Sequence, residues 1–237
     1  MIYRFMAEMG SRAEGAAGKL IVLLELGASN SMLNFYKGKI LVFSREIPVG
    51  GEHLTHALAK GIIIPGGTTN ISIDDAEKIK RTCGISLEDK EKTEYLTDFG
   101  MLRGEQISAM LRPILERRVI EVTRTLNYYI KTFKTPTNLI GELYLSGGAS
   151  RLRNIDKFLL YNLPGFKKVE CLNSLKAVKG WADTGVFKQE LVVEQAAPHL
   201  AVAFGLCLGS GGKVNLLPLK EKVEQQVIFF STVLRFF

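Results

Sequence analysis

The feature that most constrains the fold is a run of apolar residues, LIVLLEL at positions 20–26, which ends at Gly27. A strand with one face in water alternates apolar and polar side chains, whereas this run is apolar at almost every position. The run therefore predicts a strand that is covered on both faces, inside a layered domain. A chain of 237 residues, 46% of them hydrophobic, is long enough to bury such a core.

The rest of the chain alternates strand and helix patterns, which favours an α/β domain. We expect strands at 31–36 and 40–47, joined as a hairpin around Gly38, and further strands at 142–146 and 167–172. Helices are expected at about 52–60, from a cap at Ser72 or Asp74 to Gly84, at 152–163 and at 196–209. Residues 61–72 resemble a loop, and the charged stretch 86–98 a solvated excursion.

One long helix stands out between Glu105 and Phe133, with Pro113 as the place where it would bend. Its stripe of large side chains recurs every three or four residues, at Ile107, Leu111, Ile114, Arg118, Val122, Leu126, Tyr129 and Phe133. Such a stripe predicts that the helix packs on a sheet.

Composition limits the partners and the compartment. The net charge of +7 comes from basic residues that are scattered among acids, so a nucleic acid partner is not expected. Cys83, Cys171 and Cys207 lie far apart without metal-site spacing, which indicates reduced core thiols in a cytosolic protein. The first residues lack the apolar segment of a signal peptide.

The end of the chain has a different character. Residues 227–237, VIFFSTVLRFF, are strongly apolar and follow several lysines. Eleven residues are too few to span a bilayer, but basic residues before an apolar run are typical of the cytoplasmic side of a membrane helix. We therefore interpret this tail as the possible start of a membrane helix.

Three short segments could hold a ligand. In ELGASNS the turn amides from Gly27 to Ser31 could bind phosphate oxygens, and Glu25 could orient a metal-bound water. Glu77 and Lys80 share one helix face, and the pair Gly147-Gly148 ends a strand. Each segment also has a plainer interpretation: a hairpin, a stabilising ion pair and a tight turn.

The signatures of several enzyme classes are missing from the sequence. His53, His56 and His199 have no H-E-x-x-H pattern and are interpreted as surface residues. The chain contains no G-x-S-x-G elbow, no Walker A motif and no G-x-G-x-x-G fingerprint.

The order of the segments resembles that in the second half of the actin/Hsp70-type ATPase fold. Their amino-acid sequences are similar to those of the PilM family of type IV pilus assembly proteins, which is related to FtsA. The resemblance rests on ELGASNSML, REIPVGG, the A-E-x-x-K helix, LSGGASRL and NLLP, and it covers about 20–218. It implies an α/β, actin-like (ribonuclease H-like) fold in which a mixed sheet is flanked by helices.

The resemblance also implies a site for ATP with Mg²⁺, in which no protein side chain ligates the metal directly. Residues that would contact the phosphates or the edge of the cleft are Gly27, Ala28, Ser29, Asn30, Ser31, Gly50 and Gly51. Glu77 and Lys80 would hold the ribose, and Gly147, Gly148 and Arg151 would flank the adenine. Glu25 stands where the family usually has aspartate, so we expect ATP binding more than efficient hydrolysis.

The resemblance implies three parts of the chain. Residues 1–19 would be a remnant of a preceding helix or linker, and 20–212 an actin-like half-domain with an insertion at about 61–104. Residues 213–237 would be the NLLP motif (Asn215, Leu216, Leu217, Pro218) with the apolar tail. The family's first phosphate hairpin is not recognised before Lys19, so the chain is expected to be a fragment or a reduced homologue.

By resemblance, the function is that of a cytoplasmic nucleotide-binding scaffold, peripheral at the inner membrane, in the type IV pilus assembly complex. Its partners would be a PilN-like membrane protein, whose beginning the NLLP segment also resembles, other pilus components and further copies of itself. The alternatives are an actin-like component of cell division or type II secretion, a sugar-kinase-like enzyme, and a half-domain that binds a partner without nucleotide.

Overall fold

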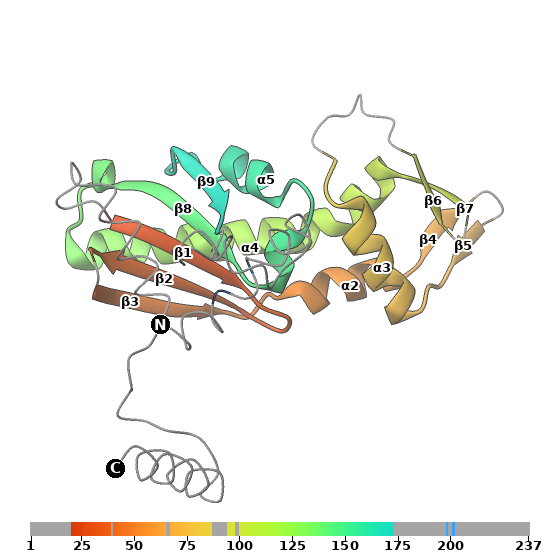
Figure 1. Ribbon diagram of the computed structural model, residues 1–237, viewed down its shortest axis with the longest axis horizontal. Helices are drawn as coiled ribbons and strands as arrows, with labels where there is room; N and C mark the ends of the chain where they lie inside the picture. Colours follow the sequence, from red (N-terminus) through yellow and green to blue (C-terminus); the bar gives the residue numbers. More distant parts are fainter. Residues whose placement is uncertain are drawn as a thin grey trace, which may run out of the picture.

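The computed structural model describes residues 20–38, 40–64, 67–86, 94–97 and 100–172, together with Pro198 and Ala201. Its centre is a five-stranded mixed sheet in the order β3-β2-β1-β8-β9 (Figure 1). The strands are β1 (Leu20–Leu26), β2 (Ser31–Lys37), β3 (Ile40–Ile47), β8 (Ile140–Ser146) and β9 (Lys168–Cys171). β1, β2 and β3 form an antiparallel meander, whereas β1 with β8 and β8 with β9 are parallel.

The parallel pairing of β1 with β8 positions the site. It places Glu25 beside Ser146, so the glycines that follow the two strands, Gly27 and Gly147, lie together at the C-terminal ends of β1 and β8. Because β1 and β8 run in the same direction, segments more than 100 positions apart in sequence arrive at the same end of the sheet.

Helices and short 3₁₀ turns connect the strands. They are α2 (Gly51–Ala59), α3 (Ile73–Cys83), α4 (Gly104–Phe133), η1 (Thr137–Leu139), η2 (Gly148–Arg151) and α5 (Ile155–Asn162). Ser72 is the N-cap of α3, because its Oγ accepts a hydrogen bond from the backbone N–H of Asp75 at 3.1 Å. Gly84 ends α3 with a φ of +71°.

The main core lies on one face of the sheet. The even-numbered residues of β1 point to this face and pack with side chains from α2, α3, α4 and α5. The stripe predicted for α4 is largely buried there, although Phe133 at its end is half exposed. Leu23 points to the other face and packs with Tyr36, Tyr144, Leu172 and Ala201. The prediction that β1 is covered on both faces is therefore confirmed.

Two sequence predictions around α3 were wrong. Residues 61–72 were expected to form a loop, but they contain β4 (Ile62–Ile64) and β5 (Gly67–Thr69), which pair antiparallel. The charged stretch 86–98 contains β6 (Glu94–Thr97), which pairs with β7 (Gly100–Arg103). Such short strands have weak local signals, and pairing with a neighbour decides whether they form. Figure 1 shows that β4–β7 lie together with α3 at one end of the molecule.

Smaller corrections concern the element ends. The helix expected at 152–163 begins only at Ile155, because η2 and a turn precede it. The strand expected at 142–146 is β8, which is two residues longer at its start and begins at Ile140. The helix expected at about 52–60 is α2, which begins at Gly51. The helix expected at 196–209 lies outside the described residues, apart from Pro198 and Ala201.

The cysteine and tail predictions have separate outcomes. Cys83 is a buried free thiol as expected, whereas Cys171 is exposed on the edge strand β9, so the prediction of a core thiol was wrong for this residue. Cys207, residues 1–19 and the apolar tail lie outside the described residues. None of the helices in the described ranges combines the length and the apolar character that crossing a membrane requires.

Candidate functional site

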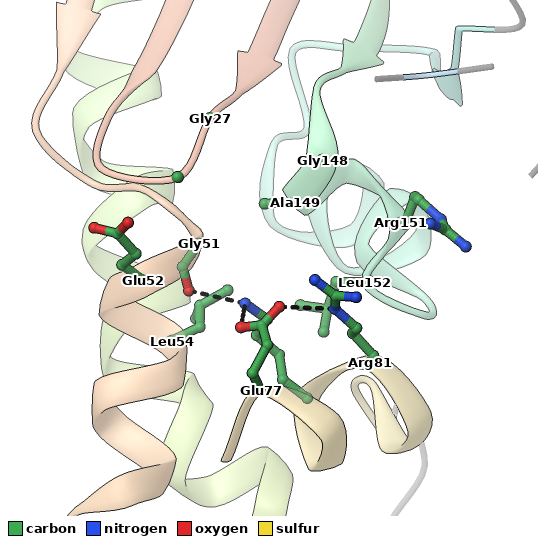
Figure 2. A pocket seen from close by; sticks show the side chains of 12 residues that line it. Gly27, Gly51, Glu52, Leu54, Glu77, Arg81, Gly148, Ala149, Arg151 and Leu152 are labelled. Carbon is green, nitrogen blue, oxygen red and sulfur yellow. Dashed lines mark hydrogen bonds and ion pairs between the residues drawn. The ribbon is translucent and has the colours of Figure 1, made fainter. Parts of the chain in front are cut away.

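A cavity of about 630 Å³ opens where the ends of β1 and β8 meet α2 and α3 (Figure 2). This volume lies within the range of 300–1,000 Å³ that is usual for small-molecule sites. The residues that line it come from four separate segments: Gly27, Ala28, Gly51, Glu52, Leu54, Glu77, Lys80, Arg81, Gly148, Ala149, Arg151 and Leu152. Figure 2 shows Glu52 and Arg151 on opposite sides of the cavity.

The first wall is the turn between β1 and β2, which sits on the beginning of α2. The backbone N–H of Gly51 donates to the Gly27 carbonyl at 2.9 Å, and the N–H of Glu52 donates to the Ala28 carbonyl at 2.8 Å. A Cβ atom on Gly50 would lie 2.1 Å from the Ala28 carbonyl oxygen, so only glycine permits this approach. The turn is therefore fixed in place by two of the first amides of α2.

Hydrogen bonds anchor the remaining polar groups of this turn. The Ser31 hydroxyl donates to the Val49 carbonyl, and the Asn30 amide donates to the Glu46 carboxylate. The phosphate contact predicted for the turn amides at Asn30 and Ser31 stays a prediction, and in the structure the side chains of these residues tie the turn to β3 and to the residues after it. Neither they nor Ser29 lines the cavity.

The second wall is α3, whose predicted pair Glu77 and Lys80 does face the cavity. The Lys80 ammonium donates to Glu77 Oε2, and Arg81 Nε donates to Glu77 Oε1 at 2.9 Å (Figure 2). Burial alone would raise the pKa of Glu77, but hydrogen bonds from Lys80, Thr55 and Arg81 outweigh it and lower the pKa to about 2. Glu77 is therefore an ionised acceptor at neutral pH.

The third wall is the turn after β8, where the two adjacent glycines have different roles. Gly147 has a φ of +86°, and a Cβ on it would lie 2.4 Å from the Leu26 carbonyl oxygen. Its N–H donates to the Pro198 carbonyl at 2.9 Å. Gly148 is different, because a Cβ there would meet no heavy atom within 4 Å. Gly147 thus serves the fold, and Gly148 leaves open space in the cavity.

Glu25 does not line the cavity. It alternates with Leu24 and Leu26 along β1 and so lies on the opposite face of the sheet, where it is half-buried. Burial raises the pKa of its carboxyl group above the ordinary value. The role predicted for Glu25 in orienting a metal-bound water stays a prediction. In the described part of the chain no cluster of three or more histidine, cysteine or acidic residues could hold a metal ion.

Several lining residues were not predicted from the sequence. Glu52, Leu54, Arg81, Ala149 and Leu152 each lie within a few positions of a predicted residue, so they have no motif of their own. His53 was also misread as a surface residue: it is half-buried, and its Nδ1 accepts the Gly50 N–H at 3.1 Å at the start of α2. His56 is exposed as expected, and His199 lies outside the described residues.

A family model described as Cell division protein FtsA matches residues 22–205. The chain belongs to this family. A curated member, the Cell division protein FtsA of Bacillus subtilis (strain 168), is 21% identical over 139 residues, which are 57% of this chain and 30% of that protein. The chain therefore spans less than a third of the length of that FtsA relative.

Two solved structures have the same fold. The PilM-PilN type IV pilus biogenesis complex has a TM-score of 0.63 and 23% identity over 87% of this chain and 50% of that chain. MreB 5 of Spiroplasma citri bound to AMPPNP has a TM-score of 0.58 and 15% identity over 95% of this chain and 60% of that chain. These matches confirm the predicted α/β, actin-like fold and the resemblance to PilM and FtsA.

Proposed function

We propose that the cavity binds ATP and that the chain is an actin-like scaffold, not an efficient hydrolase. The observation that carries this proposal is the convergence of four segments that the sequence singled out on one cavity, where Gly27, Ala28, Gly51, Glu77, Lys80, Gly148 and Arg151 all line the wall. A similar structure, MreB 5, has AMPPNP bound. In such a scaffold, ATP acts by shifting the equilibrium between conformations that differ in affinity for partners.

The residues fit a nucleotide in chemical terms. The ionised Glu77 carboxylate suits the hydroxyl groups of a ribose, and the basic side chains of Arg81 and Arg151 suit an anionic ligand. The open space at Gly148 suits a flat group such as a purine ring. Mg²⁺ would enter with the phosphates and supply charge neutralisation.

Isothermal titration of the whole chain with ATP and Mg²⁺ tests the site. Gly148→Asp adds a charged side chain to the open part of the cavity, so affinity is expected to fall more than about tenfold. Gly141→Asp is the matched control, because a Cβ there also meets nothing within 4 Å but Gly141 does not line the cavity. Equal losses in both variants, or no binding by the unmodified chain, would contradict the proposal.

For the cellular role, we infer a place in a pilus assembly complex at the cytoplasmic side of the inner membrane, with a PilN-like partner. The support is the similarity to the PilM-PilN complex. A role in cell division is the second candidate, which the FtsA family match favours. Deletion of the gene distinguishes them: loss of pili with normal septation supports the first, and filamentous cells with normal pili support the second.

A further inference from the structure

The ammonium group of Lys80 donates hydrogen bonds to three acceptors within the protein. It donates to the Gly51 carbonyl at 3.2 Å, to Thr55 Oγ1 at 2.9 Å and to Glu77 Oε2. An ammonium group has three protons, and these three acceptors account for them. The side chain is also buried, at 8% exposure for the residue. Lys80 therefore has no donor left for a sugar hydroxyl, in contrast to the role that the family resemblance implied.

Thr55 on α2 connects Glu77 and Lys80 of α3. Its hydroxyl donates to Glu77 Oε2 at 2.6 Å and accepts from Lys80, so one small side chain orders both. Thr55 is buried and does not line the cavity. A ligand in the cavity would not touch it, so any effect of Thr55 on binding must pass through the groups that its hydroxyl contacts: Glu77, Lys80 and, at 3.2 Å, the Gly51 carbonyl.

The two oxygens of Glu77 are used unequally. Oε2 accepts from both Thr55 and Lys80, whereas within the described ranges Oε1 accepts from Arg81 alone. A carboxylate oxygen can accept two hydrogen bonds. Oε1 thus keeps one acceptor position, while Oε2 fixes the direction in which the carboxylate points.

We propose that Thr55 and Lys80 are positioning residues that hold the Glu77 carboxylate in a single orientation, so that Oε1 is presented to the sugar of the ligand. This inference rests on the proposed nucleotide binding. It assigns the direct contact to Glu77 and makes the link between α2 and α3 part of ligand selection. A carboxylate that is already oriented loses less conformational freedom when the ligand binds.

The first test needs no ligand. The pKa of the Glu77 carboxyl group is measured by carbon-detected NMR in the unmodified chain and in Thr55→Val, Thr55→Ser and Lys80→Met variants. Thr55→Val removes the hydroxyl at nearly constant volume, and Thr55→Ser keeps it. The pKa is expected to lie near 2 in the unmodified chain and in Thr55→Ser, and to rise toward 4.5 in Thr55→Val and Lys80→Met.

The second test measures selection for the sugar. The ratio of the affinities for ATP and 2′,3′-dideoxy-ATP reports the contact with the ribose hydroxyls, and the ratio for ATP and adenosine reports the phosphates. Thr55→Val is expected to reduce the first ratio about tenfold and leave the second unchanged. Thr55→Ser is expected to restore it.

The outcomes separate the two proposals. If the unmodified chain binds no nucleotide, the proposed function fails, and the carboxyl pKa alone decides whether Thr55 and Lys80 order Glu77. If Thr55→Val and Thr55→Ser have the same pKa or the same sugar ratio, the positioning role is overturned even though ATP binds.

Discussion

Arg118 is a cation inside the main core. It belongs to the apolar stripe of α4, between Leu115 and Val122, and it is fully buried. In the described part of the chain none of its three guanidinium nitrogens has a hydrogen-bond partner. Burial lowers the pKa of this group to about 10, which reflects the unfavourable free energy of a charge removed from water. Periodicity placed this residue correctly, although its chemistry opposes burial.

Arg118→Met is expected to stabilise the protein. A methionine fills a similar space without a charge, and replacing buried charges by apolar side chains often increases the free energy of unfolding by about 1–4 kcal/mol. Arg117→Met is the control, because Arg117 is exposed and its replacement should change stability by less than about 0.5 kcal/mol. Urea unfolding measures both. A less stable Arg118→Met variant would show that the guanidinium group has a partner that this structure does not identify.

At the scale of elements, the β1–β2 turn packs against the start of α2, and this contact forms one wall of the cavity. The turn carbonyls accept from the first amides of α2, and Gly50 allows the two backbones to touch. A second link joins α2 to α3 through Thr55 and Lys80. α2 therefore connects the sheet to α3 and contributes to two walls of the cavity.

Gly50→Ala is expected to lower the free energy of unfolding by about 1–3 kcal/mol, the usual cost of overpacking. The added Cβ would overlap the Ala28 carbonyl, and backbone on both sides must shift. Gly148→Ala should be tolerated, because its Cβ enters open space and its φ is not positive. Thermal unfolding of the two variants makes the comparison. A Gly50→Ala variant as stable as Gly148→Ala would mean that the turn is not seated on α2 in solution.

At the scale of the whole molecule, α4 links the end that contains α3 and β4–β7 to the five-stranded sheet (Figure 1). It follows β7 directly and packs on α2 and β3 along its length. Near its C-terminal end the Tyr129 ring stacks on Phe35 at a centroid distance of 4.4 Å and also contacts Phe43. One continuous core runs from these rings to Leu102 of β7 and to α3. We therefore expect the described part of the chain to unfold as one unit.

Tyr129→Ala is expected to reduce the free energy of unfolding by about 3–5 kcal/mol in a single transition. Tyr128 is the matched control, because it is the adjacent residue of the same helix and is half exposed. Its replacement by alanine should cost much less. Urea unfolding, followed by both circular dichroism and tyrosine fluorescence, would reveal two separate transitions if α4 did not join the ends.

Features with a local physical cause were determined by the sequence alone. A short run that is apolar at almost every position and ends at glycine favours a strand covered on both faces, so β1 was predicted with its exact ends. The end of α3 at Gly84 was predicted because glycine accepts a positive φ, and its start was narrowed to a cap at Ser72 or Asp74, of which Ser72 is the cap in the structure. Of the four segments that line the cavity, the β1–β2 turn, α3 and the turn after β8 were likewise singled out by their glycines and by the spacing of Glu77 and Lys80.

The tertiary structure alone decided what these residues do. Gly147 and Gly148 are identical in sequence terms, yet one lies against Leu26 and the other faces open space. The role of Lys80 in sugar binding stays a prediction, and only the structure shows that its ammonium group donates to Gly51 and Thr55 of α2. Hydrogen-bonding capacity and free volume depend on which distant segments meet, and the packing of α2, α3 and the parallel strands fixes that choice.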